Sequence, residues 1–104
     1  MEEFAEKQAE IFSIFSNAKR VLIFWQLDGA EMSVNDIANA IDSSTQNTSQ
    51  HLRLMKSRGI LTSRRDGKTI YYSIADSELG KYCQLIHQVY LMRILKVEGV
   101  DLPR

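Results

Sequence analysis

The stretch at residues 43–61, SSTQNTSQHLRLMKSRGIL, is the most informative part of the chain, because its two halves differ in composition. The second half is rich in residues that favour a helix, whereas the first half is crowded with Ser, Thr, Gln and Asn. Small hydroxyl and amide side chains compete with the backbone for hydrogen bonds and weaken helix interiors. A helix start also favours carboxylates, because the helix dipole attracts anions, yet none is present here. This pattern indicates that the first turns of the helix contact something outside the chain.

Two helices and a turn build this part of the chain. Ser33 is a candidate N-cap for a short helix over residues 34–41, and Ser44 is a candidate N-cap for the helix over residues 45–58. Gly59 suits the position just beyond that second helix, because glycine adopts the left-handed backbone conformation without strain. A short helix, a turn and a second helix are the parts of a helix-turn-helix unit.

A β-hairpin is expected after the second helix. The segments ILTSRR and KTIYYSI contain the Ile, Thr and Tyr that are typical of strands, and Asp66-Gly67 between them is a strong turn signal. A hairpin directly after a helix-turn-helix predicts a winged helix, which is a mainly α-helical fold with a β-hairpin wing. We place the helix-turn-helix at about residues 33–58 and the wing at about residues 60–74.

Further helices flank this unit. Apolar spacing predicts a helix over residues 3–15, and Asn17 is a candidate N-cap for another over residues 18–27. A long helix is expected over about residues 76–97. Its stripe of positions repeats every three or four residues: Leu79, Tyr82, Cys83, Ile86, Val89, Tyr90, Arg93, Ile94 and Val97. No later element can cover this stripe, so we expect a partner to cover it.

The composition predicts one small cytoplasmic domain, residues 1–104. A chain of 104 residues that is 44% hydrophobic can form one core, and so small a core gains from oligomerisation. The single cysteine excludes an intramolecular disulfide and favours a reducing compartment. The chain does not open with a basic segment followed by an apolar run, so we expect no secretory signal. Its apolar runs are too short to span a membrane.

Charge is unevenly distributed, although the net charge is zero. Residues 1–42 carry three basic and eight acidic side chains, whereas residues 43–75 carry six basic and one acidic. Such a polarised pattern marks residues 43–75 as a candidate surface for an anionic partner, such as double-stranded DNA. The alternative is that these cations form an ordinary solvated surface.

The polar half of the helix over residues 45–58 suits the major groove of DNA. A recognition helix presents its N-terminal residues to base edges, where amides pair with adenine and arginine pairs with guanine. Phosphates would repel a carboxylate there, which explains the absence of Asp and Glu. Thr48, Leu52 and Met55 point to the domain interior on this spacing. The base-reading candidates are Gln46, Ser49, Gln50 and Arg53, and the DNA-backbone candidates on this helix are Thr45 and Lys56. The alternative is an ordinary polar surface helix.

The predicted wing carries three cations around its turn. Arg64, Arg65 and Lys68 flank Asp66-Gly67 and are candidates for contacts with the DNA backbone. A basic hairpin tip can lie along a phosphate strand or insert an arginine into the minor groove. The alternative is a tip that only improves solubility.

The sequence of the helix-turn-helix and wing resembles that of a known family. The run SVNDIANAIDSSTQNTSQHLRLMKSRGILTSRRDGKTIYYSI resembles the helix-turn-helix and wing of the ArsR–SmtB winged-helix repressors. SQHLRLMKSRGIL, the basic turn and YYSI carry the match, and NAKRVLIFWQL, with Arg20, resembles a further helix of the family. The resemblance covers about residues 16–75 well, and the outer helices agree in position and length. It implies a homodimer built on the first and last helices that binds an inverted repeat in the control region of its own gene.

The metal sites known in that family are not reproduced. Metal-sensing members use a cysteine cluster in the first helix of the helix-turn-helix, or Asp and His ligands on the last helix. Residues 31–41 contain no cysteine. The only candidate ligands on the last helix, whose spacing departs from the family pattern, are Asp76, Glu78, Cys83 and His87. We therefore predict no metal site and no cofactor.

Cys83 and His87 lie four residues apart and so share one face of the last helix. In one interpretation, Cys83 is a small buried hydrophobe in the dimer interface and His87 lies at its rim. In a second, the thiol is a redox or sulfur switch. In a third, two such pairs meet across a dimer axis and bind zinc. Catalysis by the pair is not expected, because no third group orients it. His51 is assigned to the scaffold of the recognition helix, near a phosphate.

These features together predict a homodimeric DNA-binding transcriptional regulator that represses by blocking a promoter, and not an enzyme. The alternative is a winged-helix protein-interaction module without sequence-specific DNA binding. The acidic residues 1–42 would then form its working face. The wing tip discriminates between the two, because such a module does not need Arg64, Arg65 and Lys68 together.

Overall fold

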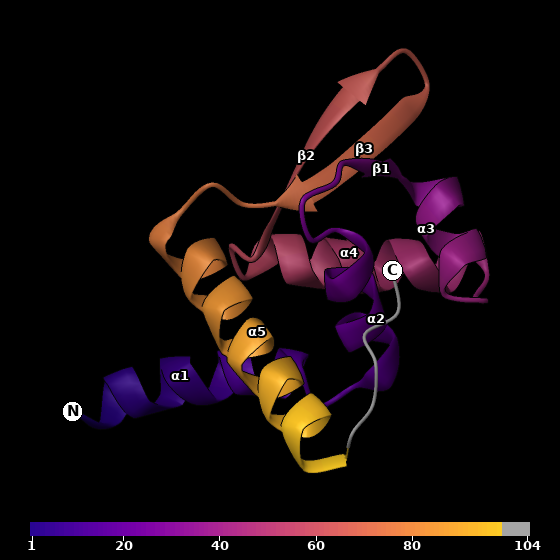
Figure 1. Cartoon of the computed structure of the whole chain (residues 1–104). Helices are drawn as coiled ribbons and strands as arrows, with labels where there is room; N and C mark the ends of the chain where they lie inside the picture. Colours follow the sequence, from indigo (N-terminus) through magenta and orange to yellow (C-terminus); the bar gives the residue numbers. More distant parts are fainter. Residues whose placement is uncertain (99–104) are drawn as a thin grey trace.

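The computed structural model of the protein describes residues 1–98. The elements follow in the order α1 (Glu2–Ile14), α2 (Ala18–Gln26), β1 (Met32–Ser33), α3 (Val34–Ala40), α4 (Thr45–Ser57), β2 (Leu61–Asp66), β3 (Thr69–Ile74) and α5 (Glu78–Glu98). Figure 1 shows the β2–β3 hairpin projecting from one end, with α3 and α4 beneath it and with α1 and α5 at the other end. The predicted mainly α-helical winged helix-turn-helix fold is confirmed.

The predicted caps start three of the helices. A side-chain oxygen of each cap accepts a hydrogen bond from the backbone N–H three residues later, at 3.2 Å for Asn17, 3.1 Å for Ser33 and 3.0 Å for Ser44. Such bonds satisfy backbone donors that have no partner inside the helix. The starts of α2, α3 and α4 therefore follow from local sequence alone.

The two helices of the helix-turn-helix end in the same way. Gly59 has φ +78°, and its N–H and that of Ile60 bond back to the last turn of α4. Asp42 takes the same left-handed conformation after α3, with φ +53°. The conformation is less favourable for aspartate than for glycine. The Lys19 ammonium stabilises this end of α3 by donating to the carbonyls of Ile41 (2.5 Å) and Asp42 (3.1 Å).

The wing is part of a three-stranded antiparallel sheet in the order β1-β3-β2. The sequence did not indicate β1, because a strand of two residues has no periodicity and pairs with a distant segment. The position of the turn also needs correction. Asp66 pairs with Thr69, so the two-residue loop is Gly67-Lys68 and not Asp66-Gly67. Gly67 has φ +63°, which is the conformation that the first position of a tight hairpin turn of this kind requires.

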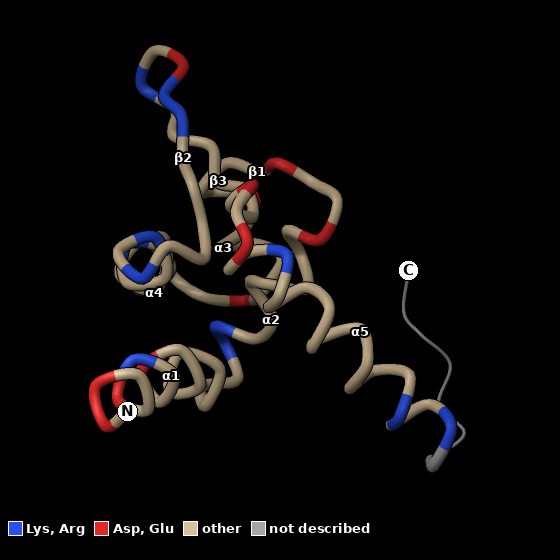
Figure 2. Tube along the Cα trace, turned by 90° about the vertical axis from the view of Figure 1, so that its left-hand side faces the viewer, with Lys and Arg blue, Asp and Glu red and all other residues tan. Residues whose placement is uncertain are grey.

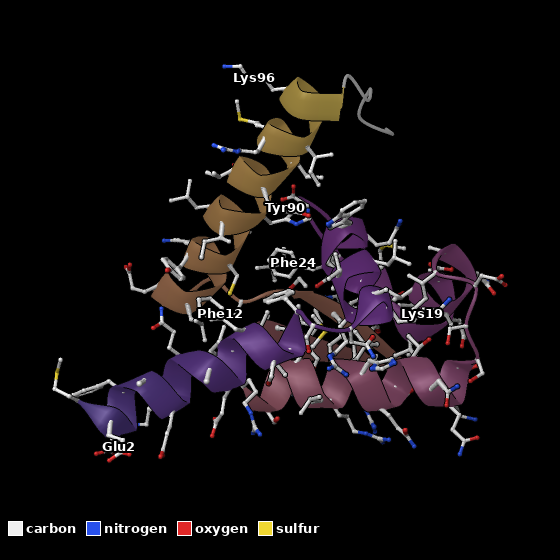
Figure 3. The ribbon with its side chains drawn as sticks, turned by 90° about the horizontal axis from the view of Figure 1, so that it is seen from below. Glu2, Phe12, Lys19, Phe24, Tyr90 and Lys96 are labelled. Atoms are coloured by element: carbon white, nitrogen blue, oxygen red, sulfur yellow. The ribbon has the colours of Figure 1, made fainter. Side chains whose placement is uncertain are left out.

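The core lies where α2, α3 and α4 meet the base of the sheet. Its buried side chains include Ile14, Ile23, Phe24, Leu27, Ile37, Ile41, Leu52, Met55, Ile60, Leu61, Tyr72 and Cys83. Phe24 lies between α2 and α5 in Figure 3 and makes an edge contact with the Phe15 ring. This core holds α4 against β2, so the core fixes the position of the wing relative to α4.

Helix α5 begins two residues later than expected, because Ser77 caps it by accepting from the N–H of Gly80 at 3.1 Å. Its predicted stripe is correct only in part: Cys83 packs into the core, whereas Tyr82, Ile86, Val89 and Tyr90 stay exposed. The large apolar side chains exposed on α5 are Tyr82, Leu85, Ile86, Val89, Tyr90 and Met92, and those on α1 are Phe4 and Phe12. The side chain of Val97 lies outside the described residues. No helix within residues 1–98 is long and apolar enough to cross a membrane.

Candidate nucleic-acid interface

Helix α4 has one buried face and one polar outer face. Thr48, Leu52 and Met55 are completely buried, as their spacing predicts. The candidates for contact with DNA lie on the remaining surface, with Thr45, Gln46, Gln50, Arg53 and Lys56 exposed and Ser49 half-buried. The first turn of α4 contains no acidic residue. The arrangement presents amide, hydroxyl and guanidinium groups to solvent while Leu52 and Met55 anchor the helix.

Charge in the folded protein is separated as the sequence predicts. Figure 2 shows Lys and Arg on α4 and along β2 to the wing tip, whereas many of the acidic residues lie on α1 and around α2 and α3. A polyanion that approached α4 and the wing would therefore meet positive potential. Basic residues from the middle third of the chain therefore lie together on α4 and the wing.

The sheet register assigns the wing residues to two opposite faces, because side chains alternate along a strand. Ser63 pairs with Tyr72, and Arg65 pairs with Ile70, so all four side chains share one face. Lys56 of α4 donates to the Ser63 hydroxyl at 2.7 Å, which identifies this face as the one turned toward α4. We call it the α4 face of the wing.

Arg64 lies on the opposite face of the wing, where it is already engaged. Its Nε donates to both carboxylate oxygens of Glu31, at 2.9 and 3.0 Å, and its terminal nitrogen donates at 2.7 Å. The guanidinium carbon also stands 4.6 Å from the ring centroid of Tyr71, its cross-strand partner. The hydrogen bonds from Arg64 lower the pKa of the Glu31 carboxyl, and the same bonds raise the pKa of Arg64. No local pattern indicates this pair, because its two members are 33 positions apart in the chain.

Arg65 and Lys68 differ from Arg64 in being unpaired. Both side chains are exposed at or near the tip of the wing. Within residues 1–98, neither takes part in an ion pair or a side-chain hydrogen bond. The structure therefore leaves these two of the three predicted wing cations available for an external anion.

Arg20 connects α1, α2 and α4. Its Nε donates to the carbonyl of Ile14 at 2.7 Å, and a terminal nitrogen lies 3.4 Å from Nδ1 of His51 on α4. Partial burial, followed by the charge of Arg20, lowers the pKa of His51. His51 thus joins α4 to Arg20 of α2, in line with its assignment to the scaffold, and its proximity to a phosphate stays a prediction.

The His87 side chain is half-buried against α2, and its predicted place at the rim of a dimer interface stays a prediction. Its Nδ1 accepts a hydrogen bond from Nε1 of Trp25 at 2.9 Å, and its ring makes an edge contact with Phe24 at 5.6 Å. Burial lowers the pKa of His87, an effect that the nearby Asp28 carboxylate partly offsets. The side chain therefore joins α5 to α2 and faces away from the exposed stripe.

Cys83 is buried, with 5% of its surface exposed. Burial raises the pKa of its thiol and so disfavours the thiolate, which is the form that attacks oxidants and binds metals. Within residues 1–98, no three His, Cys, Asp or Glu side chains gather closely enough to hold a metal ion. In this protomer, Cys83 acts as a small apolar residue of the core.

Comparison with known proteins shows the family to which the chain belongs. A domain family described as a helix-turn-helix domain matches residues 15–64. The chain is 40% identical over 84 residues to the cadmium resistance transcriptional regulatory protein CadC homolog of Staphylococcus aureus, covering 80% of this chain and 67% of that protein. It is 34% identical over 97 residues to the HTH-type transcriptional regulator KmtR of Mycobacterium tuberculosis, covering 91% and 69% respectively. The chain belongs to the ArsR–SmtB family of winged-helix transcriptional regulators.

Solved structures of relatives agree with this assignment to the ArsR–SmtB family. NolR from Sinorhizobium fredii superposes with a TM-score of 0.73 and 35% identity, over 86% of this chain and 89% of that chain. HlyU from Vibrio cholerae superposes with a TM-score of 0.76 and 25% identity, over 88% and 99%. The resemblance inferred from the helix-turn-helix and wing is confirmed.

Proposed function

We propose that this family member is a homodimeric repressor that binds an inverted repeat in DNA and blocks a promoter in the cytoplasm. The observation that carries the proposal is the exposed outer face of α4, which is polar and free of carboxylates and lies beside two unpaired wing cations. The relatives are named as regulators of transcription, so no catalytic role and no cofactor is proposed.

In this proposal, α4 enters the major groove and reads base edges. The base contacts come from Gln46, Ser49, Gln50 and Arg53. Thr45 and Lys56 contact phosphates at the two ends of the groove-facing surface. The hydrogen bond from Lys56 to Ser63 supports a phosphate role for Lys56, because it orients the ammonium between α4 and the wing. Arg65 and Lys68 hold the DNA backbone next to the groove that α4 occupies.

The dimer in this proposal is formed by α1 and α5. Support comes from their exposed apolar side chains, since large apolar patches on a surface mark interaction sites. A structural neighbour from Mycobacterium bovis, similar in fold with a TM-score of 0.78 at 24% identity, is described as a homodimeric winged helix-turn-helix DNA-binding domain. A two-fold dimer would place two α4 helices about one DNA turn apart, roughly 34–36 Å, facing two half-sites.

A charge-reversal experiment separates this function from that of a protein-interaction module. Arg65→Glu combined with Lys68→Glu should abolish binding to a duplex from the control region of the protein's own gene, measured by fluorescence anisotropy. Lys7→Glu combined with Lys81→Glu changes the charge equally at exposed positions away from the wing. Because these residues lie on α1 and α5, the control is used with a sedimentation measurement that shows its dimer to be intact. Unchanged DNA binding by the wing variant would contradict the proposal and favour the protein-interaction alternative.

A further inference from the structure

We propose that Glu31 and Arg64 form a clamp that holds the wing at the angle at which Arg65 and Lys68 reach the DNA backbone. Arg64 is then a positioning residue and is not itself a phosphate contact. This inference rests on the proposed DNA-binding function and revises the role that the sequence predicted for Arg64.

The clamp joins the loop before β1 to the β2–β3 hairpin, two parts of the chain that backbone pairing connects only weakly. Glu31 belongs to the loop that leads into β1 and α3, whereas Arg64 and Tyr71 belong to β2 and β3 of the hairpin. Strand β1 attaches to the hairpin through only two residue pairs, Met32 with Tyr72 and Ser33 with Tyr71. The Glu31–Arg64 contact adds a further attachment just before Met32, the first paired residue of β1. It therefore restrains how far the hairpin can bend relative to α3.

The geometry of the clamp is well suited to fixing an orientation. The guanidinium is held by hydrogen bonds to both oxygens of one carboxylate and also packs over the Tyr71 ring. A planar guanidinium bound in this two-oxygen manner specifies direction as well as distance, which a lysine ammonium does not. Both side chains remain partly exposed, at 55% for Arg64 and 38% for Glu31. Exposed ion pairs contribute little to folding stability, so we assign this pair an effect on the orientation of the wing.

The face on which Arg64 lies argues against a direct phosphate contact. Arg64 points away from the α4 face of the wing, on which Ser63 and Arg65 lie. A DNA strand held by α4 and Arg65 would therefore lie on the other side of the sheet. A phosphate that approached Arg64 would also meet the Glu31 carboxylate at hydrogen-bond distance from the same guanidinium, and the two anions would repel each other.

The experiment compares Glu31→Gln, Arg64→Ala and the double variant, with Arg65→Ala as the matched control from the other face of the wing. Duplex binding is measured by fluorescence anisotropy at several salt concentrations. The clamp predicts that each single variant weakens binding by about three- to tenfold, because a loosened wing must be ordered again when DNA binds. It also predicts that the double variant is no weaker than either single one. The salt slope should stay unchanged in all three but fall by about one in the control.

Two results would overturn the clamp. If Glu31→Gln tightens binding while Arg64→Ala lowers the salt slope by about one, then Arg64 is a phosphate contact for which Glu31 competes. If neither variant changes affinity, the pair does not position the wing.

A second measurement keeps this inference separate from the proposed function. Amide hydrogen exchange of β2 and β3 is recorded in the free protein, where DNA plays no part. Faster exchange after Glu31→Gln would support the clamp even if the wild-type protein bound no duplex. Unchanged exchange would overturn it, whatever the protein binds.

Discussion

The substitution Leu85→Ala should weaken self-association strongly without unfolding the protomer. Leu85 is 60% exposed on α5, on the same outward face as Tyr82, Val89 and Met92. These four residues follow the three-and-four spacing of a helical stripe, and they lie opposite the face that Cys83 and His87 turn toward the core. A second copy that covers this stripe would bury Leu85 twice, once in each protomer.

The magnitude follows from the exposed area. Full burial of a leucine side chain is worth about 1.5–3 kcal/mol, and about 0.6 of that remains to be gained at a residue 60% exposed. This amounts to about 1–2 kcal/mol for each protomer and about 2–4 kcal/mol for the dimer. At about 1.4 kcal/mol per factor of ten, the dimer Kd should rise roughly 30- to 700-fold. The free energy of unfolding of the protomer should change by less than about 0.5 kcal/mol, because the side chain is exposed there.

Sedimentation equilibrium over a range of protein concentrations measures the dimer Kd directly. Asn39→Ala, at an exposed position on α3 far from α5, is the control and should leave self-association unchanged. An unchanged dimer Kd for Leu85→Ala would mean that a second copy does not cover this face of α5.

Three further predictions concern DNA binding and pH. Gln50→Ala should cost about 1–3 kcal/mol of binding free energy and relax base preference at one position, as measured by competition among variant duplexes; an unchanged preference would show that the assignment of α4 residues to bases is wrong. Arg65→Ala should weaken binding to all duplexes alike and lower the salt slope by about one, whereas a sequence-dependent loss would mean that it reads bases. The protein should lose stability as the pH falls below about 6.5, because burial lowers the pKa of His87 and the unfolded chain therefore takes up this proton more readily. His87→Asn keeps a hydrogen-bond acceptor for Trp25 but does not titrate, so the Tm of this variant should fall less between about pH 7.5 and 5. Part of the fall in Tm should remain, because the pKa of His51 is lowered as well.

Local signals in the sequence were enough to predict the helix-turn-helix. Ser33, Ser44 and Gly59 act on backbone groups within a few residues, so their structural effect can be read without the rest of the fold. The burial of Leu52 and Met55 also follows from helical spacing alone. The exposed polar face of α4 was predictable for the same reason.

The features that the sequence did not reveal depend on distant partners. Nothing in the local sequence shows that Glu31 will meet Arg64, which made the three wing cations look equivalent until the strand register separated their faces. Helix α5 carries apolar residues on most of its surface, so spacing alone could not say which of them would face the core. The hydrogen bond from Trp25 to His87 shows which side of α5 faces α2, and it joins residues that are 62 positions apart.

Selection from a randomised duplex pool shows whether the protein reads a two-fold symmetric DNA sequence. The purified protein is incubated with the pool at moderate salt, and the retained duplexes are sequenced. We expect enrichment of an inverted repeat whose half-sites lie about 10–10.5 base pairs apart, centre to centre, because two α4 helices would face successive turns of the major groove. Retention of a featureless pool, bound only at low salt, would mean that α4 and the wing form a nonspecific basic surface and that the protein does not read a DNA sequence.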